Sequence, residues 1–201
     1  MGRPKQRILL RGRPMLDYAV DAFLSSRVRE VLVVVRPGVQ WRCPLGARVV
    51  VNPRPSAGMS SSLRVGLKSL DPLTEGVLVG LGDKPALQAS TIDALILARS
   101  KSNASIMVPT FRGSRGNPVL FDRALFPCLQ RLRGDQGARA FLQRNASMVL
   151  EVAVDDPGVT LDVNVPEDVR RMSRLLARLP SSSMRRPERA SPPLPGRSPS
   201  N

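Results

Sequence analysis

The sequence predicts an α/β protein with a mostly parallel sheet between layers of helices. Continuous apolar runs at 31–35, 49–51 and 77–81 are each followed within two residues by Pro or Gly, which is typical of buried strands. Segments with apolar residues at helical spacing lie between these runs. Strands that alternate with helices in this way favour a sheet covered on both faces.

The run 77–81 is followed by Gly82, Asp83, Lys84 and Pro85. Ligands of parallel α/β sheets bind beyond the carboxyl ends of the strands, and Asp83 lies at such an end. A carboxylate in this position could cap a turn or a helix, or it could bind a metal ion that faces a phosphate ligand. Its position alone leaves both interpretations open.

The remaining elements follow from periodicity and from turn residues. Helices are expected at 14–25, around 63–70, at 91–100, 122–132, 135–144 and 166–179, and further strands at 105–108, 119–121 and 148–154. Pro14 can open its helix, and Ser90 and Asp93 resemble a capping box. The segment 58–62 offers serine N-caps and backbone amides that could contact an anion or a nucleotide.

The composition favours one domain over residues 1–179 and a disordered, Pro- and Ser-rich tail over 180–201. Apolar residues make up 42% of the chain, which is enough for a core. No apolar run approaches the roughly 18–20 residues of a membrane helix, and no signal-peptide pattern opens the chain. Cys43 and Cys128 form no C-x-x-C motif, so a reduced, cytoplasmic setting is expected.

The charge and the absence of histidine restrict the chemistry. Without histidine there is no Ser-His-Asp or Cys-His nucleophile and no H-E-x-x-H zinc site. The net charge of +15 would attract nucleic acid, anionic lipid or phosphorylated small molecules. Because the arginines are scattered and aromatics are few, the sequence does not favour nucleic-acid binding, and no membrane partner is expected. Catalysis would therefore use carboxylates, Lys or Arg, backbone amides or a bound metal.

Seven short segments occur together in the order and spacing of one family. They are M-G-R-P-K-Q at 1–6, N-P at 52–53, G-M-S-S-S-L at 58–63, L-G-D-K-P at 81–85, R-G-N-P-V-L-F at 115–121, G-D-Q-G-A-R at 134–139 and L-D-V-N-V-P-E-D at 161–168. Over residues 1–179 the chain resembles the MobA-like nucleotidyltransferases, nearest to the molybdopterin cytidylyltransferases. The resemblance implies a Rossmann-like three-layer α/β/α sandwich with a mostly parallel mixed sheet.

The resemblance also implies an activity: magnesium-dependent transfer of CMP from CTP to the phosphate of a molybdopterin-type cofactor, with release of pyrophosphate. The residues it assigns are Lys5 and Asp83 for catalysis; Arg3, Lys5, Gly58, Met59, Ser60 and Ser61 for the nucleotide; Gly116, Asn117 and Pro118 for the acceptor; and Asp83, Asp162 and Asn164 for Mg²⁺. A molybdenum hydroxylase or its chaperone would be a further partner.

The residue types suit this chemistry. An acceptor that is already a phosphate needs alignment and charge neutralisation more than it needs a strong general base. A hard cation held by one or two carboxylates bridges phosphate oxygens, and cationic side chains offset the remaining charge. A site without histidine can perform this reaction.

The chain departs from the family pattern in three places. The family begins with a strand and a glycine-rich loop before the segment that Met1 opens here, and we expect the true start to lie upstream. Asn164 is more typical of the guanylyl group, whereas L-G-D favours CTP. Lys84 replaces a common glutamine; it could contact a phosphate or point to solvent, and we expect the latter.

Two alternatives remain open. One is a guanylyltransferase, or another transferase of the same fold with a different phosphate acceptor. The other is a non-catalytic truncated relic that binds a nucleotide or a partner enzyme. Replacing Asp83 separates the classes, because a passive binder without metal would tolerate the change.

Overall fold

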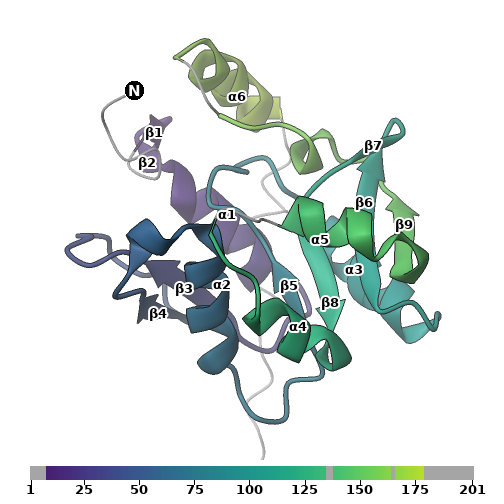
Figure 1. Ribbon diagram of the computed structural model, residues 1–201. Helices are drawn as coiled ribbons and strands as arrows, with labels where there is room; N and C mark the ends of the chain where they lie inside the picture. The colour runs from purple at the N-terminus through teal and green to yellow at the C-terminus, as the bar shows by residue number, and fades with distance from the viewer. Residues whose placement is uncertain (1–7, 135–137, 164–165, 179–201) are drawn as a thin grey trace, which may run out of the picture.

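The computed structural model describes residues 8–134, 138–163 and 166–178, and within them it contains three sheets, of which the two larger are covered by helices (Figure 1). A two-stranded sheet pairs β3 (Val31–Val35) with β4 (Ala47–Val51) in parallel. A five-stranded sheet contains β5 (Gly76–Val79), β6 (Ile106–Phe111), β7 (Ser114–Arg115), β8 (Val119–Asp122) and β9 (Val149–Ala153). A small antiparallel pair, β1 (Leu9–Leu10) and β2 (Arg13–Pro14), precedes the first helix.

The five-stranded sheet is mixed, as predicted, although three of its four strand pairings are antiparallel. β9 runs parallel to β6, whereas β8 lies between β5 and β6 and runs antiparallel to both. β5, β6 and β9 therefore share one direction. Among the described residues, β3 pairs only with β4 and β5 pairs only with β8, so no backbone ladder joins the two sheets.

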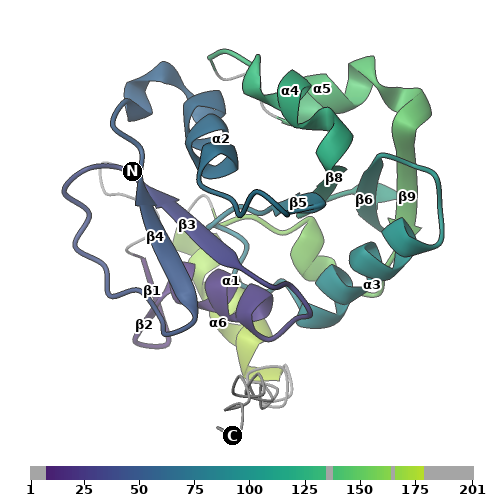
Figure 2. The same cartoon turned by 90° about the horizontal axis from the view of Figure 1, so that it is seen from below.

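The helices form two outer layers, which Figure 2 shows on opposite sides of the strands. The helices are α1 (Met15–Leu24), α2 (Met59–Lys68), α3 (Ala89–Ser100), α4 (Phe126–Gln130), α5 (Ala138–Arg144) and α6 (Pro166–Arg178), and the short 3₁₀ turns are η2 (Pro55–Ala57), η3 (Arg123–Leu125), η4 (Ala146–Met148) and η5 (Pro157–Val159). Helices α2, α4 and α5 lie on one side, and α1 and α3 lie on the other. This arrangement confirms the three-layer prediction.

Apolar side chains on both faces of the strands explain the two layers. On one face, Phe121 and Ile106 are fully buried against Leu67 of α2 and Leu129 of α4. On the other face, Met107 and Leu120 pack against Leu95 of α3. Because neighbouring residues of a strand point to opposite faces, a continuous apolar run supplies both cores.

Several expected helix boundaries were wrong. The predicted 122–132 helix is the turn η3 followed by the short α4, and the described part of the next helix starts at Ala138. Helix α3 begins at Ala89 with no side-chain cap, so Ser90 and Asp93 form no capping box. Asp93 instead accepts a hydrogen bond from the backbone N–H of Arg27 at 2.8 Å, a tertiary contact that local spacing does not reveal.

No helix within the described ranges is long and apolar enough to cross a bilayer. The predicted tail at 180–201 lies outside the described residues, and so the boundary at residue 179 stays a prediction.

Candidate active site

The segment that follows β5 forms the centre of the candidate site. β5 ends at Val79, and the chain then turns through Gly82 and Asp83. Asp83 is partly buried, and the next residue, Lys84, is 4% exposed. The expectation that Lys84 points to solvent was wrong. The side chain turns inward because it meets a carboxylate there.

Lys84 joins two segments that lie far apart in the sequence. Its Nζ atom is 2.6 Å from Oδ1 of Asp162, whose side chain is 44% exposed. The chain neighbour of Asp83 thus contacts the second predicted metal-binding carboxylate. The structure brings residue 84 of L-G-D-K-P into contact with residue 162 of the second segment.

A buried carboxylate, Asp156, stabilises this arrangement through hydrogen bonds. It is 2% exposed and accepts hydrogen bonds from the backbone N–H of Gln88 at 2.9 Å, the hydroxyl of Thr91 at 2.8 Å and the backbone N–H of Gly158 at 2.8 Å. Asp156 therefore fastens the turn η5 to the start of α3. This fastening places Asp162, which follows η5, beside Lys84.

Two glycines allow the backbones to approach closely at this point. A Cβ atom on Gly158 would lie 2.3 Å from the carbonyl oxygen of Ala86, and one on Gly116 would lie 2.4 Å from that of Val159. The N–H of Asn117 donates to the same Val159 oxygen at 2.9 Å. The predicted acceptor segment Gly116, Asn117 and Pro118 therefore packs against η5, next to the segment that carries Asp162.

The predicted nucleotide segment at the start of α2 is anchored by Asn52. Asn52 is 1% exposed, and its side-chain amide donates to the hydroxyls of Ser61 at 2.7 Å and Ser62 at 3.0 Å. Its carbonyl oxygen accepts from the N–H of Arg54 at 3.0 Å. Asn52 thus connects the end of β4 to the first turn of α2.

The serines of this segment face the protein interior. Ser60 and Ser61 are 2% and 4% exposed, and the Ser61 hydroxyl donates to the carbonyl of Gly58 at 2.9 Å. The N–H of Ser60 donates to the carbonyl of Gly134 at 3.2 Å, which joins this segment to G-D-Q-G. The N-cap of α2 is Gly58 and not a serine. Of the four predicted residues, Met59 is exposed at 56% and Gly58 is partly exposed.

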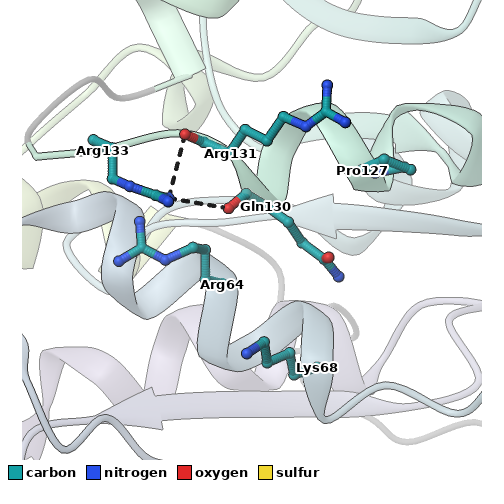
Figure 3. A pocket seen from close by; sticks show the side chains of 6 residues that line it. All are labelled: Arg64, Lys68, Pro127, Gln130, Arg131 and Arg133. Atoms are coloured by element: carbon teal, nitrogen blue, oxygen red, sulfur yellow. Dashed lines mark hydrogen bonds between the residues drawn. The ribbon is translucent and has the colours of Figure 1, made fainter.

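A basic pocket lies between α2 and α4, close to this segment. It has a volume of about 630 Å³, and its lining residues are Arg64, Lys68, Pro127, Gln130, Arg131 and Arg133 (Figure 3).

Two of the pocket guanidinium groups donate hydrogen bonds to carbonyl oxygens at the end of α4 and just after it. Arg133 donates to the carbonyl oxygens of Gln130, Arg131 and Leu132 at 3.2–3.4 Å. Arg64 donates to the Leu132 carbonyl and, at 3.3 Å, to the Ser60 hydroxyl. The Gln130 carbonyl is at the end of α4 and those of Arg131 and Leu132 follow it, so these bonds pair carbonyl oxygens at and just after the helix end. The pocket therefore has a structural role, which it combines with a positive surface.

The carboxylates present fit a magnesium site. Mg²⁺ prefers oxygen ligands, and it is commonly held by one or two carboxylates together with substrate phosphates and water. Asp83 and Asp162 match this donor set. No group of three or more Asp, Glu, Cys or His side chains that could hold a metal occurs among the described residues, so the remaining ligands would come from the nucleotide and from water.

Three of the predicted site residues, Arg3, Lys5 and Asn164, lie outside the described ranges, as do residues 135–137 of G-D-Q-G. The sequence indicated no role for Asp156, and it marked Asn52 only as part of the N-P motif at 52–53, with no function assigned. The local spacing of Asp156 and Gly158 shows only a turn, because the other two partners of Asp156, Gln88 and Thr91, lie 68 and 65 positions away.

The fold and the carboxylates after β5 define the class of protein: a three-layer α/β/α domain of the nucleotidyltransferase type. The chain belongs to the MobA-like NTP transferase domain family, whose model matches residues 1–149.

Two curated proteins that are similar to this chain have names that refer to different functions. It is 29% identical over 183 residues to nicotine blue oxidoreductase of Paenarthrobacter nicotinovorans, covering 86% of this chain and 89% of that protein. It is 28% identical over 195 residues to the purine catabolism protein PucB of Bacillus subtilis, covering 88% and 91%. Family membership therefore leaves the substrate open.

Solved structures agree with the fold. Rv0371c of Mycobacterium tuberculosis, crystallised as a complex with manganese, has a TM-score of 0.74 and 30% identity, and the match covers 86% of this chain and 93% of that one. A molybdopterin-guanine dinucleotide biosynthesis protein A of Archaeoglobus fulgidus has a TM-score of 0.66 at 15% identity, covering 89% and 93%, and this likeness concerns the fold alone.

Proposed function

We propose that this protein transfers CMP from CTP to the phosphate of a molybdopterin-type cofactor and releases pyrophosphate. One observation carries the proposal: the 2.6 Å contact between Lys84 and Asp162 brings the L-G-D-K-P and L-D-V-N segments into one site. The family match and the absence of histidine support a reaction that relies on charge neutralisation. The manganese complex of Rv0371c supports a divalent metal.

In the proposed site, Asp83 and Asp162 hold Mg²⁺, with Asn164 as a further oxygen donor. When bound, the metal would supply positive charge to the phosphate oxygens of the nucleotide. Gly58 and Met59 lie against the base and ribose, and Lys5 with Arg3 neutralises the triphosphate. Gly116, Asn117 and Pro118 orient the acceptor. The protein's contribution is alignment, since the acceptor phosphate is itself the nucleophile.

We also propose the setting and the partners of this reaction. Cys43 and Cys128 are free thiols in the structure, which favours a reducing compartment such as the cytoplasm. A molybdenum hydroxylase or its chaperone would receive the finished cofactor. GTP is the alternative nucleotide, and the fold by itself does not choose between the two.

The test is a pyrophosphate-release assay with molybdopterin as acceptor and with CTP or GTP as donor. Asp83→Ala and Asp83→Asn should each lower turnover with CTP by about 100-fold or more, because both remove the charge that holds the metal. Asp71→Asn, which removes an exposed carboxylate in a turn, is the control and should retain activity.

Two outcomes would contradict the proposal. Turnover with GTP and none with CTP would show that the donor is wrong. No pyrophosphate release from any nucleoside triphosphate would exclude nucleotidyl transfer, and the redox chemistry that names the Paenarthrobacter relative would then be tested next.

A further inference from the structure

The ion pair between Lys84 and Asp162 differs from the other ion pairs of the described residues. The Lys84 side chain is 5% exposed, whereas the arginines of the other pairs are 30–53% exposed. Exposed pairs contribute little to stability and cost little to form. Removing an ammonium group from water is costly, so a buried lysine needs a close carboxylate or a function.

The fold does not depend on this pair to hold the two segments together. Asp156 already bonds the N–H groups of Gln88 and Gly158, on either side of the contact. The glycine at 158 packs directly on the backbone of Ala86. An apolar side chain at position 84 would fill the same space without the cost of burying a charge. The ammonium group is therefore better explained by the site than by the fold.

The two ends of the pair differ in accessibility. The ammonium group is enclosed, whereas the Asp162 side chain is 44% exposed and can turn toward a ligand. Lys84 also follows Asp83 directly in the chain, so the residue that pairs with one predicted metal-binding carboxylate is the chain neighbour of the other. A positive charge in this place repels a bare divalent cation and attracts phosphate oxygens.

We propose that the Lys84 ammonium group exchanges its partner, from Asp162 to a phosphate oxygen of the nucleotide, when substrate binds. Without nucleotide, Lys84 holds Asp162. With metal and nucleotide together, Asp162 leaves Lys84 for the metal, and the ammonium group donates to a phosphate oxygen. No covalent bond changes in this exchange, and each charge keeps an opposite partner. The inference rests on the proposed function and adds a nucleotide-binding residue to it.

The proposal predicts opposite effects on two ligands. In Lys84→Gln, the affinity for Mn²⁺ alone should rise by about tenfold, because competition for Asp162 and charge repulsion are both removed. At saturating Mn²⁺, the affinity for CTP should fall by about the same factor, because the phosphate contact that forms with metal and nucleotide together is lost. If the ion pair were purely structural, its loss would not change the Mn²⁺ and CTP affinities in opposite directions.

Calorimetry on the full chain measures these affinities for wild type, Lys84→Gln and Lys84→Met. If Lys84→Gln lowers the thermal midpoint, Lys84→Met serves in its place, because methionine nearly keeps the side-chain volume without the charge. Arg48→Gln, which breaks the surface pair with Glu30, removes the same charge elsewhere and should change neither affinity. Asp162→Asn should lower the affinity for Mn²⁺.

Opposite changes in Mn²⁺ and CTP affinity would support the exchange. Equal affinities in wild type and both Lys84 variants, or a parallel loss of both ligands, would overturn it. A wild type that binds Mg-GTP but not Mg-CTP would overturn the proposed donor only. The same comparison made with GTP would then decide the role of Lys84.

Discussion

Asp156 is the residue on which the geometry of the candidate site depends most. Its carboxylate accepts three hydrogen bonds while it is 2% exposed, and its partners come from the start of α3 and from η5. A buried acceptor with several donors is costly to remove, because each donor is left without a partner. Asp156 contacts no predicted substrate group, so it acts by positioning Asp162.

Replacing Asp156 with Ala should lower the free energy of unfolding by about 3 kcal/mol or more, since two N–H groups and a hydroxyl lose their acceptor. Urea denaturation measures the change. Thr91→Val, which removes only the hydroxyl partner, is the matched control and should cost less. A loss below about 0.5 kcal/mol in Asp156→Ala would show that other contacts hold η5.

Asp122 provides a pH-dependent contribution at the end of β8. Burial raises the pKa of its carboxyl, but the N–H of Ala124 and the guanidinium of Arg99 outweigh burial and bring the pKa below the ordinary value of 3.8. The Arg99 Nη2 atom lies 2.8 Å from the carboxylate. The charged form is therefore favoured in the folded state.

Because the folded-state pKa is lowered, the stability from Asp122 is complete above pH 3.8 and is lost as the pH falls through the folded value. Asp122→Asn should lower stability at neutral pH and flatten its dependence on pH in this acidic window. Urea midpoints at several pH values measure the slope, with Asp71→Asn as control. An unchanged slope in Asp122→Asn would contradict the assignment.

At the scale of elements, close contacts between backbones and rings set how the layers pack. Gly80 follows β5, and a Cβ atom there would lie 2.5 Å from the ring of Phe23 in α1. The glycine that interrupts the apolar run thus lets α1 lie over the end of the strand that leads to Asp83. The sequence shows the glycine but not the ring above it.

Gly80→Ala should lower the free energy of unfolding by about 1–3 kcal/mol, because the added methyl overlaps the Phe23 ring and forces α1 to shift. Gly66→Ala is a matched control within α2. There the nearest atom, a Val34 methyl, is 3.3 Å away, and alanine favours the helix. Thermal unfolding of both variants decides the question: equal midpoints would contradict the close packing of α1.

At the scale of the whole molecule, the layers bring segments with large sequence separation to one end of the strands. The end of β5, the turn η5 and the 116–118 segment meet there, and the start of α2 is joined to Gly134. The chain carries a net charge of +15, which would raise the local concentration of anionic substrates near the protein. This effect agrees with a nucleotide substrate without selecting one.

Much of the fold could be predicted, because it follows from local patterns. The apolar runs at 31–35 and 77–81 became β3 and β5, and the helical spacing after Pro14 became α1. The direction of β8 and the break between η3 and α4 were harder to predict from the sequence, because strand pairing and helix ends depend on partners elsewhere in the chain. The capping box at Ser90 failed for the same reason.

The sequence by itself determined the class of fold, the family and the carboxylate after β5, since apolar periodicity and short motifs are local properties of the chain. Only the tertiary structure decided that Lys84 is buried against Asp162, that Asp156 organises η5, and that Ser60 and Ser61 face inward. Burial and pairing of a polar side chain depend on residues brought near by folding, and linear spacing does not contain that information.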